Sequence, residues 1–504
     1  MRDADAIVVG SGVGGLVAAG LLARYGWRVL VCESHRVPGG ATHSFSKRGF
    51  HFDVGPSFFW GLGDPHSLNP VSQVLKVLGE SLEAVPYDPA YLYHLPDGTF
   101  PAHGRWSAYR AAVAQYSPKG ARELAEFERR LMDLYWTLRP IPILGLRSGW
   151  RLLPYLMRRH PGSLTRMAPQ LGLIYGSVGR LRDRCITDPW VRRLIDLECF
   201  LITTLAADET PIPEMAVIFG ERDQSVVDFP KGGAQAISAA LVRALRRWGG
   251  ELRTRAHVER ILVEKGRARG VRLRSGEVLR APVVISNASI WDTVGSLLAS
   301  ADLPMAYRKT ALQTPPTYSF LHVHLGIRAE GLEGLATQHV VVGDGERDIT
   351  APGAACVVSI PSVLDPGLAP PGHHAIHAFM LETWQGWHRD QGYAQRKRER
   401  AQAICRAVEQ IIPDMRERVV VEMIGTPLTH ARYLRRHQGT YGPAITAADG
   451  LFPSCHTPIR GLYRVGDSTR PGMGVPAVAA SGILCANTLV APAQVDALVR
   501  ELAR

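Results

Sequence analysis

Three glycines near the start of the chain have the spacing of a dinucleotide-binding loop. Gly10, Gly12 and Gly15 form a Gly-x-Gly-x-x-Gly pattern, with a further glycine at position 14. In this pattern the first glycine allows a sharp turn, and the second lets the backbone approach a pyrophosphate. The third lets the following helix pack closely against the strand. The chemistry that this pattern predicts is the binding of a nucleotide cofactor.

The elements around the loop fit the same prediction. An apolar strand is expected over 6–9 and a helix over 14–25, whose N-terminal amides would face the phosphates. A second strand over 29–33 ends in Glu33, where an acid can accept hydrogen bonds from ribose hydroxyls. An acid at this position fits NAD or FAD and argues against a cofactor with a 2′-phosphate.

A second motif, near the end of the chain, favours FAD over NAD. A strand over 461–465 is followed by Gly466 and Asp467, and an apolar helix is expected over 475–489. In FAD-binding folds the aspartate meets the ribityl hydroxyls or the pyrophosphate. The helix N-terminus is aimed at the flavin ring, where its partial positive charge stabilises the reduced cofactor. An NAD dehydrogenase has no need of this motif, so FAD is the predicted cofactor.

Further positions are expected to line the cofactor site. A Pro-Gly-Gly sequence at 38–40 is similar to the second glycine pair of FAD oxidoreductases, and Ser57 follows a Gly-Pro pair. The predicted cofactor-binding residues are Gly10, Gly12, Gly14, Gly15, Glu33, Gly39, Gly40, Ser57, Val258, Gly466, Asp467, Gly474, Val475 and Pro476.

Two side chains are candidates for acid–base catalysis. Glu198 lies in an apolar stretch, where burial would raise its pKa and make it usable as an acid. The alternative is a structural ion pair with Arg192 or Arg193. His430 lies near the C-terminal cofactor motif, and the alternative there is a structural hydrogen bond. The histidines and the seven cysteines lack the spacing of a metal site, so no metal is predicted.

Length and composition fit a folded enzyme with more than one domain. The chain has 504 residues, 46% hydrophobic and 21% charged, as in ordinary globular proteins. The predicted fold class is α/β with an α+β second domain. A discontinuous Rossmann-type FAD-binding domain is expected over 1–80, 228–300 and 425–504. A helical region is expected over 81–227, and a substrate domain with a mixed sheet over 301–424.

The net charge of +12 is concentrated in one segment. Residues 134–182 contain eight arginines and no acidic residue, interleaved with apolar and aromatic side chains. This composition suits the surface of an anionic membrane, with an ordinary basic protein surface as the alternative. No nucleic-acid-binding module accompanies the charge, so nucleic acid is not an expected partner. No membrane span is expected, and the chain enters its first strand at once, which predicts no signal or transit peptide.

Several longer motifs resemble one enzyme family over nearly the whole chain. They lie at 7–16, 37–40, 52–57, 195–200 and 426–430, with others at 439–443 and at the closing Gly-Asp-Ser and Pro-Gly-x-Gly-Val. The chain resembles the carotenoid isomerase branch of the phytoene-desaturase-like FAD oxidoreductases. The resemblance implies redox-neutral cis–trans isomerisation of a linear poly-cis carotenoid by an enzyme that requires reduced flavin. It also implies peripheral membrane attachment, in a plastid or on the cytoplasmic side of a bacterial membrane, both reducing compartments.

Two departures and several alternatives accompany this resemblance. Ala41 follows Gly40, where amine oxidases have an arginine, which weakens an amine oxidase interpretation. The helix after Gly474 is less bulky than in the plant isomerases, so the substrate or the reaction can differ. A desaturase, a saturase or a hydratase of polyenes would use the same scaffold, and product mass would separate these activities. A non-enzymatic prenyl-lipid escort protein would have no need of the intact nucleotide motifs.

Overall fold

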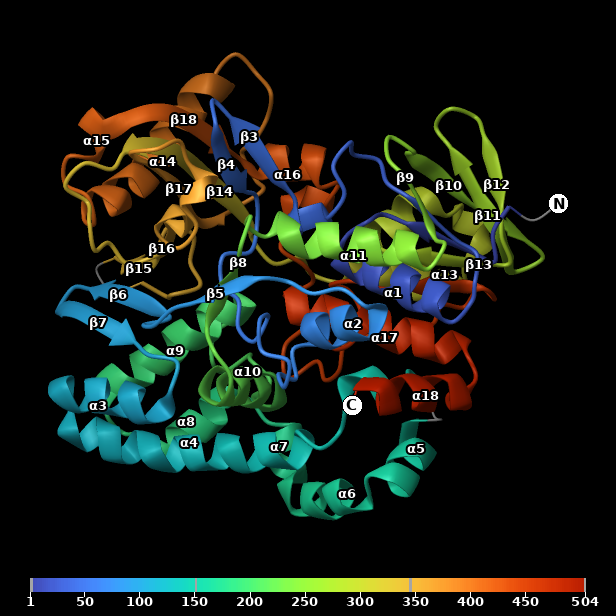
Figure 1. Cartoon of the computed structure of the whole chain (residues 1–504), viewed down its shortest axis with the longest axis horizontal. Helices are drawn as coiled ribbons and strands as arrows, with labels where there is room; N and C mark the ends of the chain where they lie inside the picture. Colours follow the sequence, from blue (N-terminus) through green and yellow to red (C-terminus); the bar gives the residue numbers. More distant parts are fainter. Residues whose placement is uncertain (1–2, 150–151, 344–346, 503–504) are drawn as a thin grey trace.

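Two large β-sheets, three smaller ones and a layer of helices make up the described part of the structure, a computed structural model that describes residues 3–149, 152–343 and 347–502. Residues 150 and 151 of the basic segment thus lie outside the described residues. In Figure 1 a parallel sheet with its helices lies on the right, a second sheet lies at the upper left, and the helical layer lies below. The predicted α/β class is confirmed.

The first sheet is parallel and joins segments from across the chain. Its strand order is β19-β13-β1-β2-β9. All residues of β1 and β2 are buried because both faces of the sheet are covered. Ala6 and Val8 pack under helices, whereas Ile7 and Val9 pack against a three-stranded sheet. The strands are β1 (Ala6–Val9), β2 (Val29–Cys32), β9 (Glu251–Arg253), β13 (Val283–Ser286) and β19 (Leu462–Arg464).

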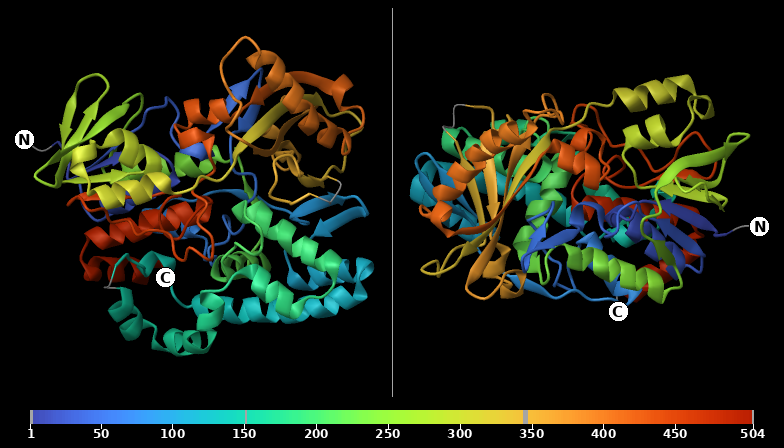
Figure 2. Two further views of the ribbon diagram at one scale, coloured as in Figure 1. Left: turned by 180° about the vertical axis from the view of Figure 1, so that it is seen from behind. Right: turned by 90° about the horizontal axis from the view of Figure 1, so that it is seen from above.

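Two helices from opposite ends of the chain touch on one face of this sheet. The helices of this face are α1 (Val13–Arg24), α2 (Pro70–Leu78), α11 (Gln235–Arg247) and α17 (Val475–Leu489). A Cβ added to Gly482 would lie 2.5 Å from the carbonyl oxygen of Gly14, so α1 and α17 meet backbone to backbone. Figure 2 shows these segments, blue and red, side by side from behind and from above. The other face carries β10 (Val258–Glu264), β11 (Arg267–Leu273) and β12 (Val278–Arg280).

The second sheet has seven strands in the order β18-β14-β17-β16-β15-β6-β7, antiparallel except for the pair β15 and β6. Along β14, Leu321 and Val323 pack toward α14, whereas Phe320 and His322 face a cavity. The elements are β6 (Tyr91–Leu95), β7 (Gly98–Ala102), β14 (Ser319–Arg328), β15 (Gln338–Val342), β16 (Ala355–Ser359), β17 (His373–Glu382), β18 (Val419–Gly425) and α14 (Tyr393–Glu409). Residues 91–102, within the range expected to be helical, thus share a sheet with 301–424. The domain limits themselves stay a prediction.

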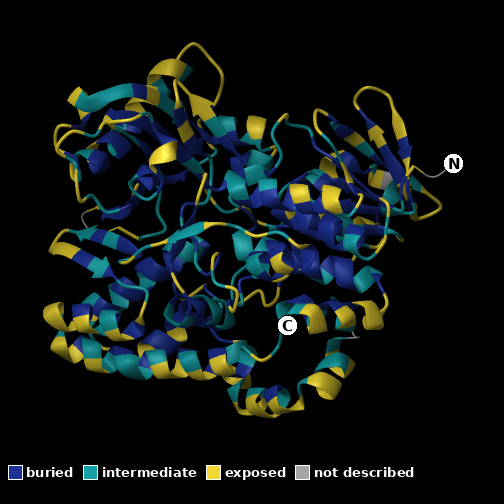
Figure 3. Cartoon of the chain, in the orientation of Figure 1, coloured by how far each residue is buried: buried dark blue, intermediate teal, exposed yellow. Residues whose placement is uncertain are grey.

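The lower layer is formed by the helices between residues 106 and 224. They are α3 (Trp106–Tyr116), α4 (Pro118–Leu138), α5 (Leu152–Arg159), α6 (Pro161–Met167), α7 (Leu171–Ile174), α8 (Val178–Cys185), α9 (Pro189–Thr203) and α10 (Ile212–Gln224). Exposed residues mark α3, α4 and α6, while α10 is mostly buried (Figure 3). Among the described helices, none combines the length and the apolarity that a membrane crossing requires.

The remaining elements are short or peripheral. They are β3 (Ser44–Lys47) with β4 (Phe50–Asp53), β5 (Ala84–Pro86) with β8 (Asp228–Pro230), and the helices α12 (Ile290–Asp292), α13 (Met305–Gln313), α15 (Met415–Arg418), α16 (Pro427–Tyr433) and α18 (Pro492–Leu502). Of these, α16 matters for the site because it carries His430 to the cavity.

Candidate functional site

One cavity of about 1260 Å³ connects the nucleotide loop with the second sheet. Its wall includes the N-termini of α1 and α17, the inner face of β14, β16 and β17, and residues of α7 and α10. The part beside the second sheet is lined largely by apolar side chains, among them Phe320, Phe379 and Ile218. A single space thus joins a nucleotide-type end to an apolar compartment.

The nucleotide end follows the first turn of α1. The amides of Val13 and Gly14 have no hydrogen-bond acceptor among the described residues, as is usual for the first turn of a helix. A Cβ at Gly12 would lie 2.5 Å from the side-chain nitrogen of Asn287, and a Cβ at Gly14 would lie 2.9 Å from the carbonyl oxygen of Val478. Glycine at these positions therefore lets the turn pack against Asn287 and α17, and the first turn of α1 lines the cavity, which fits a pyrophosphate.

Glu33 is buried at the end of β2 and lines the same end of the cavity. Its Oε2 accepts hydrogen bonds from the amide (2.8 Å) and the hydroxyl (2.6 Å) of Ser11, and its Oε1 accepts one from the amide of His35 (2.7 Å). Oε1 also accepts a longer hydrogen bond from the Ser34 hydroxyl (3.3 Å), so both carboxylate oxygens are held in place. This fixed acid fits the ribose contact that the sequence predicts.

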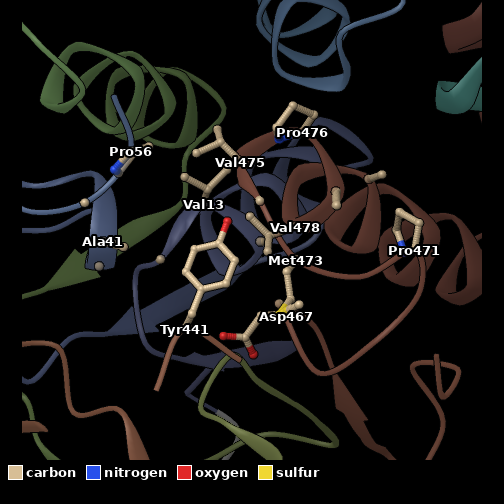
Figure 4. Close-up of a pocket in the computed structure, with 18 of the residues that line it drawn as sticks. Val13, Ala41, Pro56, Tyr441, Asp467, Pro471, Met473, Val475, Pro476 and Val478 are labelled. Carbon is tan, nitrogen blue, oxygen red and sulfur yellow. The ribbon is translucent and has the colours of Figure 1, made fainter. Parts of the chain in front are cut away.

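The N-terminus of α17 forms another part of the wall. Gly474 precedes the helix with a φ of 88°, in the left-handed region that favours glycine. Asp467 pairs with Arg436 and accepts a hydrogen bond from the Ser468 hydroxyl at 2.9 Å. Figure 4 shows Asp467 beside Tyr441, whose hydroxyl points toward Val13 and Val475. The helix end directs partial positive charge into the cavity, as a reduced flavin requires.

Nearly all the predicted cofactor-binding residues line this cavity. They are Gly10, Gly12, Gly14, Glu33, Gly39, Gly40, Ser57, Val258, Gly466, Asp467, Gly474, Val475 and Pro476. Gly15 does not line it. A Cβ at Gly15 would lie 2.5 Å from the carbonyl oxygen of Gly10, so this glycine serves the close packing of α1 on the strand. Direct contacts of these residues with the cofactor stay a prediction.

Glu198, the first acid–base candidate, does not line the cavity. It is fully buried, and its Oε2 accepts a hydrogen bond from Nη1 of Arg222 at 2.8 Å, while Arg222 also stacks over the ring of Phe219. The alternative expected Arg192 or Arg193 as the ion-pair partner of Glu198. This expectation is wrong, since Glu198 pairs with Arg222 and Arg192 pairs with Asp183. The role of Glu198 as an acid stays a prediction, and its position favours a structural ion pair.

His430, the second candidate, does line the cavity. Its ring stacks on that of His322 with 4.6 Å between the ring centres, and its Nε2 has no partner among the described residues. Burial, with a smaller contribution from Arg436, lowers the pKa of His430 to about 3. The imidazole is therefore neutral at pH 7, which suits hydrogen bonding better than proton donation.

Sequence reasoning missed a row of histidines on the inner face of the second sheet. His322 and His324 alternate along β14, and His377 lies beside them on β17. Nδ1 of His322 and Nε2 of His377 share a hydrogen bond of 2.8 Å, and burial lowers the pKa of both rings. The spacing of His322 and His324, two residues apart in a strand, was the available signal. No set of three or more side chains able to hold a metal ion occurs among the described residues.

Sequence reasoning also missed Glu214 in the first turn of α10. This carboxyl lines the cavity and has no hydrogen bond or ion pair with any described residue. Burial raises the pKa of Glu214 to about 7. In the sequence it follows Pro211 and Pro213, which makes it resemble an ordinary acid at a helix start. Only the tertiary fold turns it toward an apolar compartment.

Comparisons with known proteins agree with this geometry. A family model described as flavin containing amine oxidoreductase matches residues 13–490. Prolycopene isomerase 1, chloroplastic, of an Oncidium hybrid cultivar is 35% identical over 501 residues, covering 97% of this chain and 84% of the relative. The neurosporene-forming phytoene desaturase of Cereibacter sphaeroides is 30% identical over 520 residues, covering 96% and 94%. An oxidoreductase structure from Methanosarcina mazei has a TM-score of 0.62 at 21% identity, covering 95% and 98%.

Proposed function

From the premise that this chain belongs to the flavin-containing amine oxidoreductases, and within them to the carotenoid isomerase branch of the phytoene-desaturase-like enzymes, we propose a redox-neutral reaction. The proposed reaction is the cis–trans isomerisation of a linear poly-cis carotenoid, and it requires reduced FAD. One observation carries the proposal: the nucleotide end and an apolar compartment are parts of one continuous cavity of about 1260 Å³.

FAD is the cofactor of this enzyme, and the residues of the cavity fit it. The free amides of α1 suit the pyrophosphate, Glu33 suits the ribose, and the N-terminus of α17 suits the flavin ring. When bound and reduced, FAD supplies electron donation and negative charge, which can lower the double-bond order of a polyene. The partial positive charge at the start of α17 would stabilise that negative charge.

The apolar compartment would hold the polyene and keep water out. Phe320, Phe379 and Leu381 form an aromatic and aliphatic floor on the second sheet, and Ile218 lies on the helical side. The histidines of this floor are neutral because burial lowers their pKa. An enclosure that is largely apolar, with neutral histidines, suits a hydrocarbon.

A peripheral membrane position in a reducing compartment is part of the proposal. Within the basic segment, Leu153, Met157, Leu171 and Tyr175 are each more than half exposed. Leu152 and Ile174 of the same segment line the cavity. Apolar side chains that are exposed among arginines suit insertion into an anionic bilayer surface, and the same segment would then connect the bilayer with the cavity.

A desaturase is the second candidate, because the Cereibacter sphaeroides relative carries that name at 30% identity. It is less favoured, since the isomerase of the Oncidium cultivar is more similar to this chain. The two activities differ in the mass of their products. Isomerisation leaves the mass unchanged, whereas desaturation removes two hydrogens per step and saturation adds two.

The test is an anaerobic reaction with the FAD-loaded protein on liposomes that contain a poly-cis carotenoid. The flavin is reduced, and products are followed by chromatography with mass detection. A geometric isomer of unchanged mass, formed only with reduced flavin, is the expected result. A mass change of two hydrogens would indicate a desaturase or saturase, and the mass of added water would indicate a hydratase. A protein that binds no flavin would overturn the proposal.

A further inference from the structure

Glu214 differs from the other carboxylates of the cavity. Four others line it, and each accepts a hydrogen bond or forms an ion pair: Glu33 with Ser11 and His35, Glu259 with Arg272, Asp292 with Ser289, and Asp467 with Arg436. Glu214 has no such partner among the described residues. An acid that lies in an apolar cavity without a counter-ion is destabilising when ionised, and such acids concentrate at functional sites.

The surroundings of Glu214 are those of the proposed polyene compartment. Pro213, Val217 and Ile218 line the cavity next to it on α10. The negative charge of Glu214 contributes to the raised pKa of Tyr441, so the two side chains are within electrostatic reach. The Tyr441 hydroxyl in turn is 3.9 Å from the position of a Cβ on Gly474, at the start of α17. Glu214 therefore faces the region between the apolar compartment and the flavin-type end.

Two opposing effects set the protonation of this carboxyl. Its place in the first turn of α10 favours the charged form through the helix dipole. Burial favours the neutral form and outweighs the dipole, so the pKa of Glu214 rises to about 7. A carboxyl with a pKa near neutrality can both give and take a proton under ordinary conditions, which is the requirement for a general acid–base catalyst.

We propose that Glu214 is a catalytic residue that protonates a CH carbon of the polyene and removes a proton from the same carbon after rotation. This inference rests on the proposed isomerisation. In the first step the O–H bond of Glu214 breaks, a C–H bond forms, and the neighbouring carbon becomes the end of a delocalised cation. The former double bond is then single and rotates. Loss of a proton from the CH₂ carbon to the carboxylate restores the double bond, so no electrons are gained or lost overall.

The cation of this sequence has stabilising charges close by. The carboxylate left on Glu214 is negative, and reduced FAD would add negative charge at the flavin end of the cavity. The exclusion of water by Phe379 and Ile218 would prevent capture of the cation by hydroxide. This arrangement would account for isomerisation without addition of water.

The test uses deuterium. The FAD-loaded enzyme is equilibrated in D₂O, so Glu214 carries deuterium before the substrate binds. We expect the wild-type enzyme to release isomer that contains one deuterium in place of a hydrogen, because a CHD carbon loses hydrogen more readily than deuterium. E214Q is expected to lose the label and at least about 100-fold in rate. E214D, which keeps a carboxyl, is expected to retain the label at a lower rate. E209Q, an exposed control five positions earlier, is expected to match wild type.

A second measurement does not depend on turnover. The infrared difference between wild type and E214Q should show the carbonyl band of a protonated carboxyl, and this band should disappear as the pH rises through about 7. Three titratable groups that line the cavity, Tyr441, His430 and His322, stay neutral in that range. Burial raises the pKa of Tyr441 to about 12, and it lowers the pKa of His430 to about 3 and that of His322 well below its usual value.

The outcomes separate the two proposals. Two results would overturn the role of Glu214 and leave the isomerase proposal standing. One is a wild-type isomer that contains no deuterium. The other is an E214Q variant whose rate and deuterium label equal those of E209Q. A carboxyl that is ionised at pH 5 would overturn that role as well. If the mass of the wild-type product differs from that of the substrate by more than the deuterium label, the isomerase proposal itself would be overturned. Flavin absorbance of E214Q shows whether that variant is folded.

Discussion

A fully buried glutamate, Glu198, and a half-buried one, Glu214, show how the surroundings decide what a carboxyl can do. Glu198 lies 2.8 Å from Arg222, and its charge is neutralised away from the cavity. Glu214 has no counter-ion among the described residues and lines the cavity. In the sequence the two are hard to tell apart, because each stands among apolar residues. The sequence pattern pointed to Glu198, since a partner 24 positions away along the chain leaves no local signal.

The Glu198–Arg222 pair predicts a stability effect. In E198Q the Arg222 guanidinium would keep its charge in a buried site without a counter-ion. We expect a loss of about 3 kcal/mol in the free energy of unfolding, measured by chemical denaturation. Turnover per bound flavin should stay unchanged. Replacement of both partners, as in E198L with R222M, should recover most of the loss. A fall in turnover with unchanged stability would show that Glu198 acts in catalysis after all.

Glu214 predicts a stability that depends on pH. Its pKa is about 7 in the folded protein and 4.5 as the ordinary value. The folded state therefore binds the proton more tightly, and this contribution is complete below pH 4.5 and lost as the pH rises through 7. E214Q carries no charge at any pH. We expect E214Q to be more stable than wild type at pH 8 by roughly 1–3 kcal/mol, allowing for partial exposure to the cavity.

Denaturation of both proteins at pH 5 and pH 8 checks this expectation. The difference between E214Q and wild type should be larger at pH 8. A difference that is equal at the two pH values would mean that the carboxyl does not titrate between them.

At the scale of elements, local signals and long-range pairing differ in how well they can be predicted. The expected strand 6–9 and helix 475–489 agree with β1 and α17 to the residue, because glycine and proline mark their ends. The strands β6 and β7 were missed within an expected helical range, since β6 is placed by its pairing with β15, far along the chain. The glycine positions of the site were predictable from their spacing. The inner face of the second sheet was not, because its cavity-lining residues come from β14, β16 and β17, which are separate segments of the chain.

The contact between α1 and α17 predicts the effect of one methyl group. In G14A the new Cβ would lie 2.9 Å from the carbonyl oxygen of Val478 and 3.0 Å from the amide nitrogen of Gly466. Backbone atoms cannot yield easily, so the helix ends must separate. We expect G14A to lose bound FAD, measured by flavin absorbance of the purified protein. G172A is the control, since a Cβ there meets nothing within 4 Å, and it should bind FAD normally.

At the scale of the whole molecule, the basic segment and the cavity belong together. Helix α5 presents Leu153 and Met157, which are 58% and 61% exposed, and Leu152 of the same helix lines the cavity. Met305, which is 85% exposed, lies on α13, far from this segment in sequence. A surface that both displays apolar side chains and borders the cavity is the expected entry for a lipid substrate.

This arrangement predicts binding to vesicles. The double variant L153S with M157S should sediment with anionic liposomes several-fold less than wild type, because two apolar anchors are lost. Its circular dichroism should be unchanged, since both side chains are exposed. M305S serves as the control and should bind like wild type. Higher salt should weaken binding of all these proteins, because arginines supply the electrostatic part. Equal sedimentation of both variants would exclude α5 as the membrane contact.

The meeting of Gly14 with Gly482 also has a consequence for synthesis of the protein. The flavin site needs α1 and α17, which lie far apart in the chain, in backbone contact. During synthesis on the ribosome, the nucleotide loop and its apolar strands lack their contact with α17 until α17 has emerged. A chain that stops before α17 can fold parts of its second sheet but has no complete place for FAD. Flavin colour in this protein therefore reports that synthesis has passed α17.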